Sequence, residues 1–216
     1  TAPGPKAGGA FSIGGMVALG PETPGEAGPD RALTAYVAWL DAQGFAAEAS
    51  VARELGRRAA LGFTTELMGP VGERNLYALH PRGTLLLLPE TVAGFYHQLA
   101  ATLATGNTAT VAADATLEPL LRALPKSVAA RIVSRADWET AGPFAGALIE
   151  GDAARIMAAN ARIARLPGPL VPVQAASTPE LAADAFAYDL DRLLEEVSTS
   201  INTTAAGGNA SLMAVG

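Results

Sequence analysis

The sequence predicts an α/β fold with a Rossmann-like, doubly wound and mostly parallel sheet, on three observations. The run TLLLLP at 84–89 is short and apolar, as in a strand that is buried on both faces. Residues 92–103 then space their apolar side chains at the helical period, and TATVA at 108–112 supplies a second strand. A crossover this short requires parallel strands and a right-handed connection. Strands and helices continue to alternate after this unit, which favours helices on both faces of the sheet.

The chain before residue 66 divides into two parts. Residues 1–29 are rich in Gly and Pro, which interrupt regular backbone hydrogen bonding, so we expect a linker there. Residues 30–65 are expected to form a helical segment. Asp30 can cap its first helix, which stops at Gly44, and a second helix is expected from about Ala46 to Leu61. The basic side chains of the second helix favour a solvated face over a partner site; they are Arg53, Arg57 and Arg58.

Residues 66–196 are expected to form the Rossmann-like domain. The stretch 66–83 contains turn residues and then a loose alternation through Leu76, Ala78 and His80, which predicts a hairpin-like strand. Thr91 can cap the first core helix, and Gly106 ends it.

The second half of this domain repeats the pattern. Further strands are expected near 131–134, in FAGALIEG from Phe144, and in PLVPVQ at 169–174. Helices are expected between and after these strands. The expected caps of the first two are Thr116 and Asp152, and the last helix is expected to start at Thr178 and Pro179. The expected inward residues are Leu117, Leu120, Leu121 and Leu124, then Ile156, Ile163 and Leu166.

Composition excludes several kinds of site. The chain has 216 residues, a net charge of -6 and no cysteine. The negative charge disfavours nucleic acid and anionic membrane as partners, and the missing thiols exclude cysteine nucleophiles, thiolate metal sites and disulfides. No apolar run approaches the roughly 20 residues of a membrane helix, and the first residues lack a signal-peptide pattern. A soluble, cytoplasmic protein is expected.

The remaining polar candidates give no catalytic or metal set. His80 and His97 are the only histidines, and His97 is more simply a packing or surface residue than a ligand. The acidic residues Asp189, Asp191, Glu195 and Glu196 are expected to form a solvated face. A serine hydrolase is not expected, because no general base stands near Ser198, Ser200 or Ser211.

Four stretches carry a resemblance to a known family. GPVGERN, HPRG, LAATLATGN and, most specifically, SINTTAAGGNASLMAVG resemble the C-terminal domain of the long bifunctional proline utilisation A (PutA) flavoenzymes. GPKAGG near the start is similar to the end of the preceding aldehyde dehydrogenase module, so residues 1–29 are expected to link to it. The resemblance implies a domain related to the aldehyde dehydrogenase nucleotide-binding domain. In the full-length proteins, it implies FAD for proline oxidation and NAD for aldehyde oxidation.

The residues that an aldehyde dehydrogenase needs are missing. The chain has no cysteine nucleophile, and Gln174 stands where the resemblance places a glutamate base. PETVAG lacks the oxyanion asparagine, and TATVAADAT lacks the lysine for the cofactor ribose. The resemblance also implies that the helix after the fourth strand points at the pyrophosphate. Here Asp152 stands at that mouth, where it can cap the helix and repel a phosphate. We therefore expect no catalytic, cofactor-binding or metal-binding residue in this chain.

What remains is a binding role for an extended C-terminal motif at 197–216. Its small, uncharged residues permit close backbone approach, and its apolar end favours burial against a partner domain over folding back on its own domain. The residues expected to make this contact are Ser200, Ile201, Asn202, Thr203, Gly207, Gly208, Asn209, Ser211, Leu212 and Met213.

The resemblance implies the function of this motif. It implies a non-catalytic lid that closes the cavity through which the intermediate passes from proline dehydrogenase to L-glutamate γ-semialdehyde dehydrogenase, and that supports the aldehyde dehydrogenase site. The expected partner is the aldehyde dehydrogenase module of the same polypeptide, and the isolated fragment could self-associate through the motif. The alternative is a regulatory module that retains nucleotide (NAD) binding.

Overall fold

The structure, a computed structural model, describes residues 30–68, 72–112, 114–183, 185 and 187–202. The predicted linker at 1–29 therefore lies outside the described residues. Among these residues the helices are α2 (Arg31–Ala42), α3 (Ala46–Arg58), α4 (Val92–Ala104), α5 (Glu118–Ala123), α6 (Lys126–Ala129), α7 (Ala153–Ile163) and α8 (Thr178–Ala183). The strands are β1 (Thr64–Leu67), β2 (Glu73–Pro81), β3 (Thr84–Leu88), β4 (Thr108–Val111), β5 (Ile132–Ser134), β6 (Gly146–Glu150), β7 (Val173–Ala176) and β8 (Leu194–Asn202).

Five of these strands form a parallel sheet in the order β5-β4-β3-β6-β7. The chain starts in the middle with β3, moves outward to β5, and then returns to the other side of β3 with β6. This reversal is the signature of a doubly wound sheet, and it confirms the predicted fold class. The return places β6 directly beside β3, with Leu86 opposite Ala147 in register.

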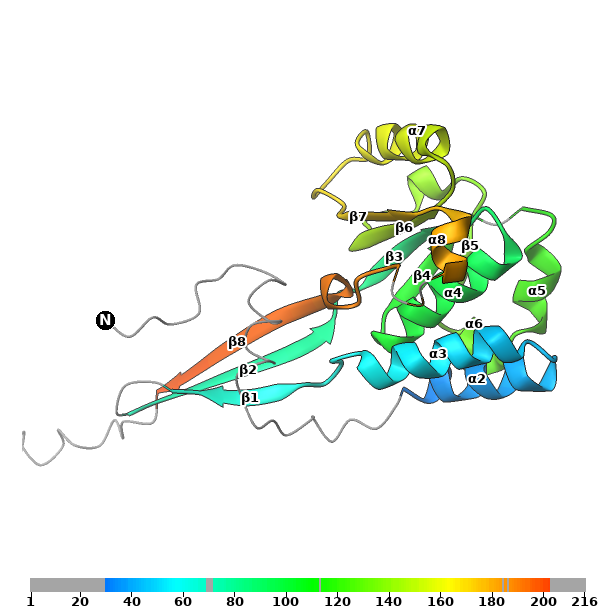
Figure 1. Cartoon of the computed structure of the whole chain (residues 1–216). Helices are drawn as coiled ribbons and strands as arrows, with labels where there is room; N and C mark the ends of the chain where they lie inside the picture. Colours follow the sequence, from blue (N-terminus) through cyan, green and yellow to red (C-terminus); the bar gives the residue numbers. More distant parts are fainter. Residues whose placement is uncertain (1–29, 69–71, 113, 184, 186, 203–216) are drawn as a thin grey trace, which may run out of the picture.

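Successive side chains of β3 point to opposite faces of this sheet. Leu85 and Leu87 belong to a core with α2, α3 and α4, whereas Leu86 and Leu88 belong to a core with α7. Figure 1 shows α7 on one side of the sheet, and α4 with α2 and α3 on the other. The predicted leucine positions after residue 116 and the predicted apolar face of α7 pack into these two cores, which confirms them.

Helix α4 is more deeply buried than a helix with one apolar stripe. All eleven residues from Gly94 to Ala104 are buried, because α3 and α2 cover the side that faces away from the sheet. An aromatic group fills this outer layer: Tyr96 of α4 lies 5.1 Å from Phe45 and 6.0 Å from Trp39, centroid to centroid. The helical segment before the sheet is thus a third layer of the same core.

The second sheet is an antiparallel arm made of β1, β2 and β8, in that order. It extends away from the parallel sheet and its helices (Figure 1). The hairpin predicted from 66–83 is confirmed, but the predicted alternation has the wrong phase. Tyr77 and Leu79 are the buried residues of β2, because they pack with Leu194 and Phe63 in a small core at the base of the arm.

Three predicted helix caps are present. The side chains of Asp30, Thr91 and Asp152 accept hydrogen bonds from the first turns of α2, α4 and α7. The predicted Thr116 cap is wrong, because Asp114 Oδ1 accepts from the backbone N–H groups of Thr116 and Leu117 instead.

Two predicted boundaries also move. Helix α3 ends at Arg58 rather than near Leu61. Strand β7 begins at Val173 rather than at 169, since Pro169 and Pro172 have no N–H to donate to a sheet ladder. The short helix α6, which follows Pro125, was not predicted.

Candidate functional site

The carboxyl end of the parallel sheet, between β3 and β6, is where ligands bind in open α/β sheets. Asp152 follows β6, and its Oδ1 accepts a hydrogen bond of 2.8 Å from Arg155 N. The prediction that this side chain caps α7 is therefore confirmed. A carboxylate in this position places negative charge at the helix end that would otherwise attract a phosphate.

Glu150, the last residue of β6, was missed by the sequence interpretation. Its side chain is completely buried. Its Oε2 accepts hydrogen bonds from Glu90 N at 2.7 Å and Thr91 N at 2.8 Å. Its Oε1 accepts from the hydroxyls of Thr91 at 2.8 Å and Thr178 at 2.9 Å. The carboxylate thus joins β6 to the start of α4 and to the start of α8. The sequence signal was a charged residue closing an otherwise apolar strand, ALIE.

Arg155 lies across the same strand ends. Its Nη2 donates to Pro89 O at 2.8 Å, and its Nε donates to Glu150 O at 2.9 Å. The guanidinium therefore links the carboxyl ends of β3 and β6 through two backbone carbonyls. These two bonds use two of the five N–H donors of the guanidinium, and they fix its position at the strand ends.

Gln174, in β7, has a structural role in this protein. Its Oε1 accepts from Asp189 N at 2.7 Å, and its Nε2 donates to Asp189 O at 3.0 Å. The amide imitates one rung of a sheet ladder and holds the segment that follows α8. A carboxylate could accept the first hydrogen bond but could not donate the second, so an amide suits this position.

The histidines and acidic residues are dispersed. His97 is buried, with Nε2 at 2.8 Å from Ala185 O and its ring edge-on to Tyr188, which confirms a packing role. His80 is exposed in the arm. Across the described ranges, no group of three or more His, Asp and Glu residues could hold a metal ion. None of the helices in the described part of the chain combines the length and apolar character that a bilayer span requires.

The acidic stretch is only partly a solvated face. Asp189 is exposed and pairs with Arg192, with a distance of 3.2 Å between Oδ2 and Nε. Burial raises the pKa of Asp191 and of Glu196 above the usual values. The prediction therefore holds for Asp189 and the exposed Glu195, whereas Asp191 and Glu196 are partly buried.

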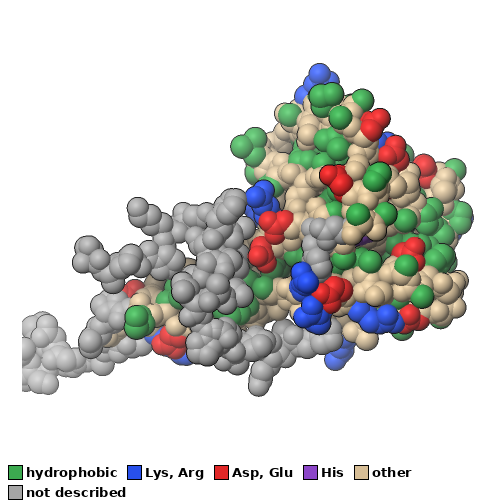
Figure 2. All heavy atoms as spheres, viewed as in Figure 1, with side chains coloured by type: hydrophobic (Ala, Val, Ile, Leu, Met, Phe, Trp, Pro, Cys, Tyr) green, Lys and Arg blue, Asp and Glu red, His purple; other side chains and the backbone are tan. Residues whose placement is uncertain are grey.

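The basic residues of α3 are exposed and already paired. Arg53 pairs with Asp41, and Arg57 and Arg58 both pair with Glu54, 2.5 Å and 2.9 Å away. The hydrogen bond from Arg57 lowers the pKa of Glu54. Figure 2 shows basic and acidic side chains lying beside one another on this face, without a large patch of one sign. The prediction of a solvated face agrees with this arrangement.

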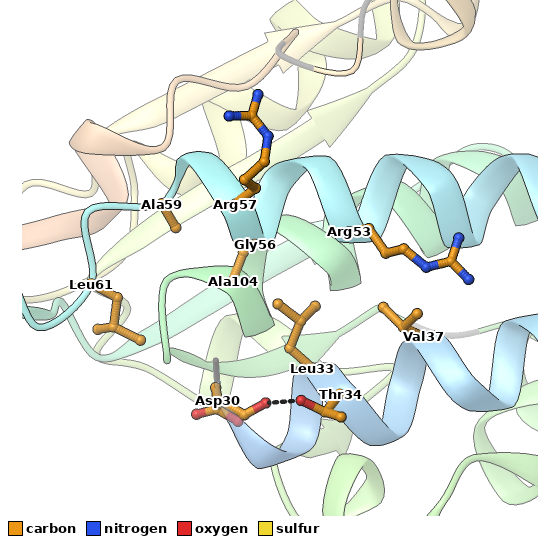
Figure 3. Close-up of a pocket in the computed structure, with 10 residues that line it drawn as sticks. All are labelled: Asp30, Leu33, Thr34, Val37, Arg53, Gly56, Arg57, Ala59, Leu61 and Ala104. Carbon is orange, nitrogen blue, oxygen red and sulfur yellow. Dashed lines mark hydrogen bonds between the residues drawn. The ribbon is translucent and has the colours of Figure 1, made fainter. Parts of the chain in front are cut away.

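A cavity of about 460 Å³ lies between α2 and α3 (Figure 3). Its lining is mostly apolar, with Leu33 and Val37 on one side and Gly56 on the other. The carboxylate of Asp30 at its edge is occupied, because it caps α2 and pairs with Arg131 at 2.9 Å. The cavity's other polar lining residues are Thr34, Arg53 and Arg57, and each of them already has a partner within the protein.

The arm is attached to the parallel-sheet body through Asn107. This buried side chain accepts a hydrogen bond from Gly83 N, which lies between β2 and β3, at 2.8 Å. It donates to the carbonyl of Leu193, directly before β8, also at 2.8 Å. A further bond from Arg82 Nη1 to Arg192 O, at 3.1 Å, lies beside it. One amide therefore holds both points at which β2 and β8 leave the body.

The arm presents an edge strand to its surroundings. Among the described residues, β8 pairs only with β2, from Leu194 opposite Pro81 to Asn202 opposite Glu73. Its last six residues are exposed, including Val197 at 36% and Ile201 at 41%. The predicted extended conformation is thus confirmed for residues 197–202.

The predicted contact residues divide between the arm and the end of the chain. Ser200, Ile201 and Asn202 lie on β8, and Ser200 Oγ is 2.5 Å from Asn75 Oδ1 of the neighbouring strand. The other predicted contact residues lie outside the described residues: Thr203, Gly207, Gly208, Asn209, Ser211, Leu212 and Met213.

Comparison with known proteins identifies relatives of this chain. No family model matches it. The bifunctional protein PutA of Rhizobium meliloti is 54% identical to it over 215 residues, which is 99% of this chain. The chain corresponds to a segment of bifunctional PutA. It spans 18% of that relative and 12% of the Escherichia coli K12 PutA, to which it is 38% identical over 164 residues.

Parts of solved structures are similar to this chain. A structure of PutA with proline bound in remote sites is 25% identical, with a TM-score of 0.47 over 66% of this chain and 18% of that one. A substrate-bound structure of Staphylococcus aureus AldH is 14% identical, with a TM-score of 0.49 over 69% of this chain and 41% of that one. The correspondence of this chain to a segment of PutA depends on sequence identity and not on these structures.

Proposed function

We propose that this chain is the non-catalytic C-terminal domain of a bifunctional proline dehydrogenase and L-glutamate γ-semialdehyde dehydrogenase. In this role it is a lid over the cavity through which the intermediate passes between the two active sites, and it supports the aldehyde dehydrogenase site. FAD and NAD would belong to other modules of that polypeptide, and the expected compartment is the cytoplasm. The proposal rests on the match to PutA together with one structural observation, the exposed edge strand β8.

An exposed edge strand is suited to covering another domain. The outer edge of such a strand can extend a sheet of the partner through backbone hydrogen bonds, and side chains on alternate positions can enter pockets there. The exposed part of β8, residues 197–202, carries Val197 and Ile201 among small, polar residues, and the predicted contact motif continues from its end. Asn107 fixes the origin of the arm, so the strand can be presented in a defined direction.

The chemistry of the domain also supports a non-catalytic role. The whole sequence lacks cysteine, and Gln174 is engaged with the backbone of Asp189 rather than directed at a substrate. Aldehyde oxidation through a thiohemiacetal needs both a thiolate and a base. The domain would therefore act by shape and contact.

Deletion of Ser200–Gly216 from a full-length PutA polypeptide that carries this domain tests the proposal. We expect coupled turnover of proline to glutamate to fall several-fold, because the intermediate escapes and the aldehyde dehydrogenase site loses support. Proline oxidation, measured alone with an artificial electron acceptor, should stay unchanged. Both rates are compared with those of Leu170→Ala, which alters a residue that is 96% exposed on the body and should affect neither. Unchanged coupled turnover in the deletion variant would rule out the lid.

The alternative function, a regulatory module that binds NAD, makes a different prediction. Titration of NAD into this chain by calorimetry should show no saturable binding below about 1 mM if the domain is a lid. Saturable binding in that range would favour the regulatory module instead. Asp152 and Glu150 both oppose such binding, because each places a carboxylate at a helix start beside the switch point.

A further inference from the structure

The start of α4 has the composition of an anion-binding site. It lies at the carboxyl end of β3, beside the point where the strand order reverses. Backbone N–H groups of Glu90 and Thr91 and the hydroxyls of Thr91 and Thr178 converge on one position there. Four donors around one position, at the positive end of a 13-residue helix, would suit a phosphate oxygen pair equally well.

In this protein the position is filled by the carboxylate of Glu150. Each of its two oxygens receives two of the four hydrogen bonds, so every converging donor is used. The side chain reaches the position from β6 without any exposure to solvent.

The surrounding structure is shaped to this carboxylate. Gly94 lies in the first turn of α4, and a Cβ atom there would be only 1.8 Å from Glu150 Oε2 and 2.2 Å from its Cδ. Glycine is unfavourable in a helix interior, so its presence beside the carboxylate is explained by the room that Glu150 needs. Arg155 closes the side between the two strand ends through Pro89 O and Glu150 O.

We infer that Glu150 is an internal ligand, an autoinhibitory contact that fills the anion-binding position at the switch point and excludes phosphate-bearing ligands from it. An external phosphate could bind here only by displacing the buried carboxylate of Glu150, which already accepts hydrogen bonds from all four donors. The domain thus keeps the ligand-binding end of a Rossmann-like sheet in a permanently occupied state. This inference does not depend on the lid role of the arm.

Removing the carboxylate tests the inference. Glu150→Ala, Glu150→Gln and the unaltered chain are each melted in sodium phosphate and in sodium chloride of matched ionic strength. We expect Glu150→Ala to melt lower in chloride, and its midpoint to rise saturably with phosphate by about 4 °C or more. The unaltered chain and Glu150→Gln should show only the unsaturable rise that phosphate gives to folded proteins in general, because a side chain still fills the position.

Three results would overturn the inference. One is a folded Glu150→Ala protein without any saturable phosphate response. Another is an equal response in the unaltered chain or in Glu150→Gln, which would place the bound phosphate elsewhere. If Glu150→Ala is unfolded in chloride, the readout becomes recovery of its far-ultraviolet circular dichroism on adding phosphate, and absence of recovery is the third.

Discussion

Replacement of Gly94 by alanine is expected to destabilise the protein by about 3 kcal/mol. In an ordinary helix interior the same change is stabilising by about 1 kcal/mol, because alanine has the higher helix propensity. Here the new Cβ would lie 1.8 Å from Glu150 Oε2, which is buried and cannot move into solvent. Either the carboxylate loses its hydrogen bonds or the start of α4 shifts. Denaturant unfolding of the two proteins measures the difference.

Gly56→Ala provides the matched control. A Cβ at Gly56 meets the end of the Leu33 side chain at 2.5 Å, but both residues line the cavity between α2 and α3, so the leucine has room to move. The control should be nearly neutral. Adding Glu150→Ala to Gly94→Ala should recover part of the lost stability, since the two residues are in contact. A Gly94→Ala protein that is as stable as the unaltered chain would contradict the assigned position of Glu150.

Asn107→Ala is expected to cost about 3 kcal/mol and to loosen the arm. The change removes the partner of the C=O of Leu193, which is buried, and of the N–H of Gly83, which is exposed, in a site where Asn107 is 1% exposed. Buried backbone groups that lose their hydrogen bonds each cost about 1–3 kcal/mol. Denaturant unfolding gives the stability, and hydrogen exchange of the β2 and β8 amides reports the arm.

Asn160→Ala is the control for this prediction, because Asn160 is exposed on α7 and far from the arm in sequence. It should be neutral in both measurements. If the β2 and β8 amides exchange no faster in Asn107→Ala than in the control, Asn107 does not hold the arm. The arm would then be fixed by the packing of Tyr77, Leu79 and Leu194 alone.

Much of the parallel sheet could be predicted because its signals are local. The run 85–88 is leucine at every position, the helix after it begins at a good N-cap in Thr91, and Gly106 adopts the left-handed φ of 69° that ends it. The weak strand at 131–134 was found because it falls where the alternation of strand and helix requires one. The fold class could therefore be predicted from the local periodicity of apolar residues and from the helix caps.

The features that were missed depend on contacts between distant segments. Glu150 is separated by about 60 positions from its partners Glu90 and Thr91, so nothing in the local sequence shows that its carboxylate is satisfied. The wrong phase of β2 has a similar cause, since its buried face is set by Leu194, more than one hundred residues later. A glycine in the first turn of an apolar helix, at Gly94, was the one local hint of a close approach.

In the proposed function, the parallel sheet is a closed scaffold and the arm makes the contact with another domain. Glu150 and Arg155 occupy the end of the sheet where a ligand would bind, whereas β8 pairs only with β2 among the described residues. In a PutA polypeptide these two properties together would give a domain that covers a cavity and performs no chemistry.

The lag before NADH forms after proline is added tests this account most directly. It is measured in full-length PutA carrying this domain, with and without Ser200–Gly216. A closed cavity delivers the intermediate without its accumulation in solution, so we predict no lag in the intact protein and a clear lag in the truncated one. An equal lag in both proteins would contradict the account, because the cavity would then be no better closed with the motif than without it.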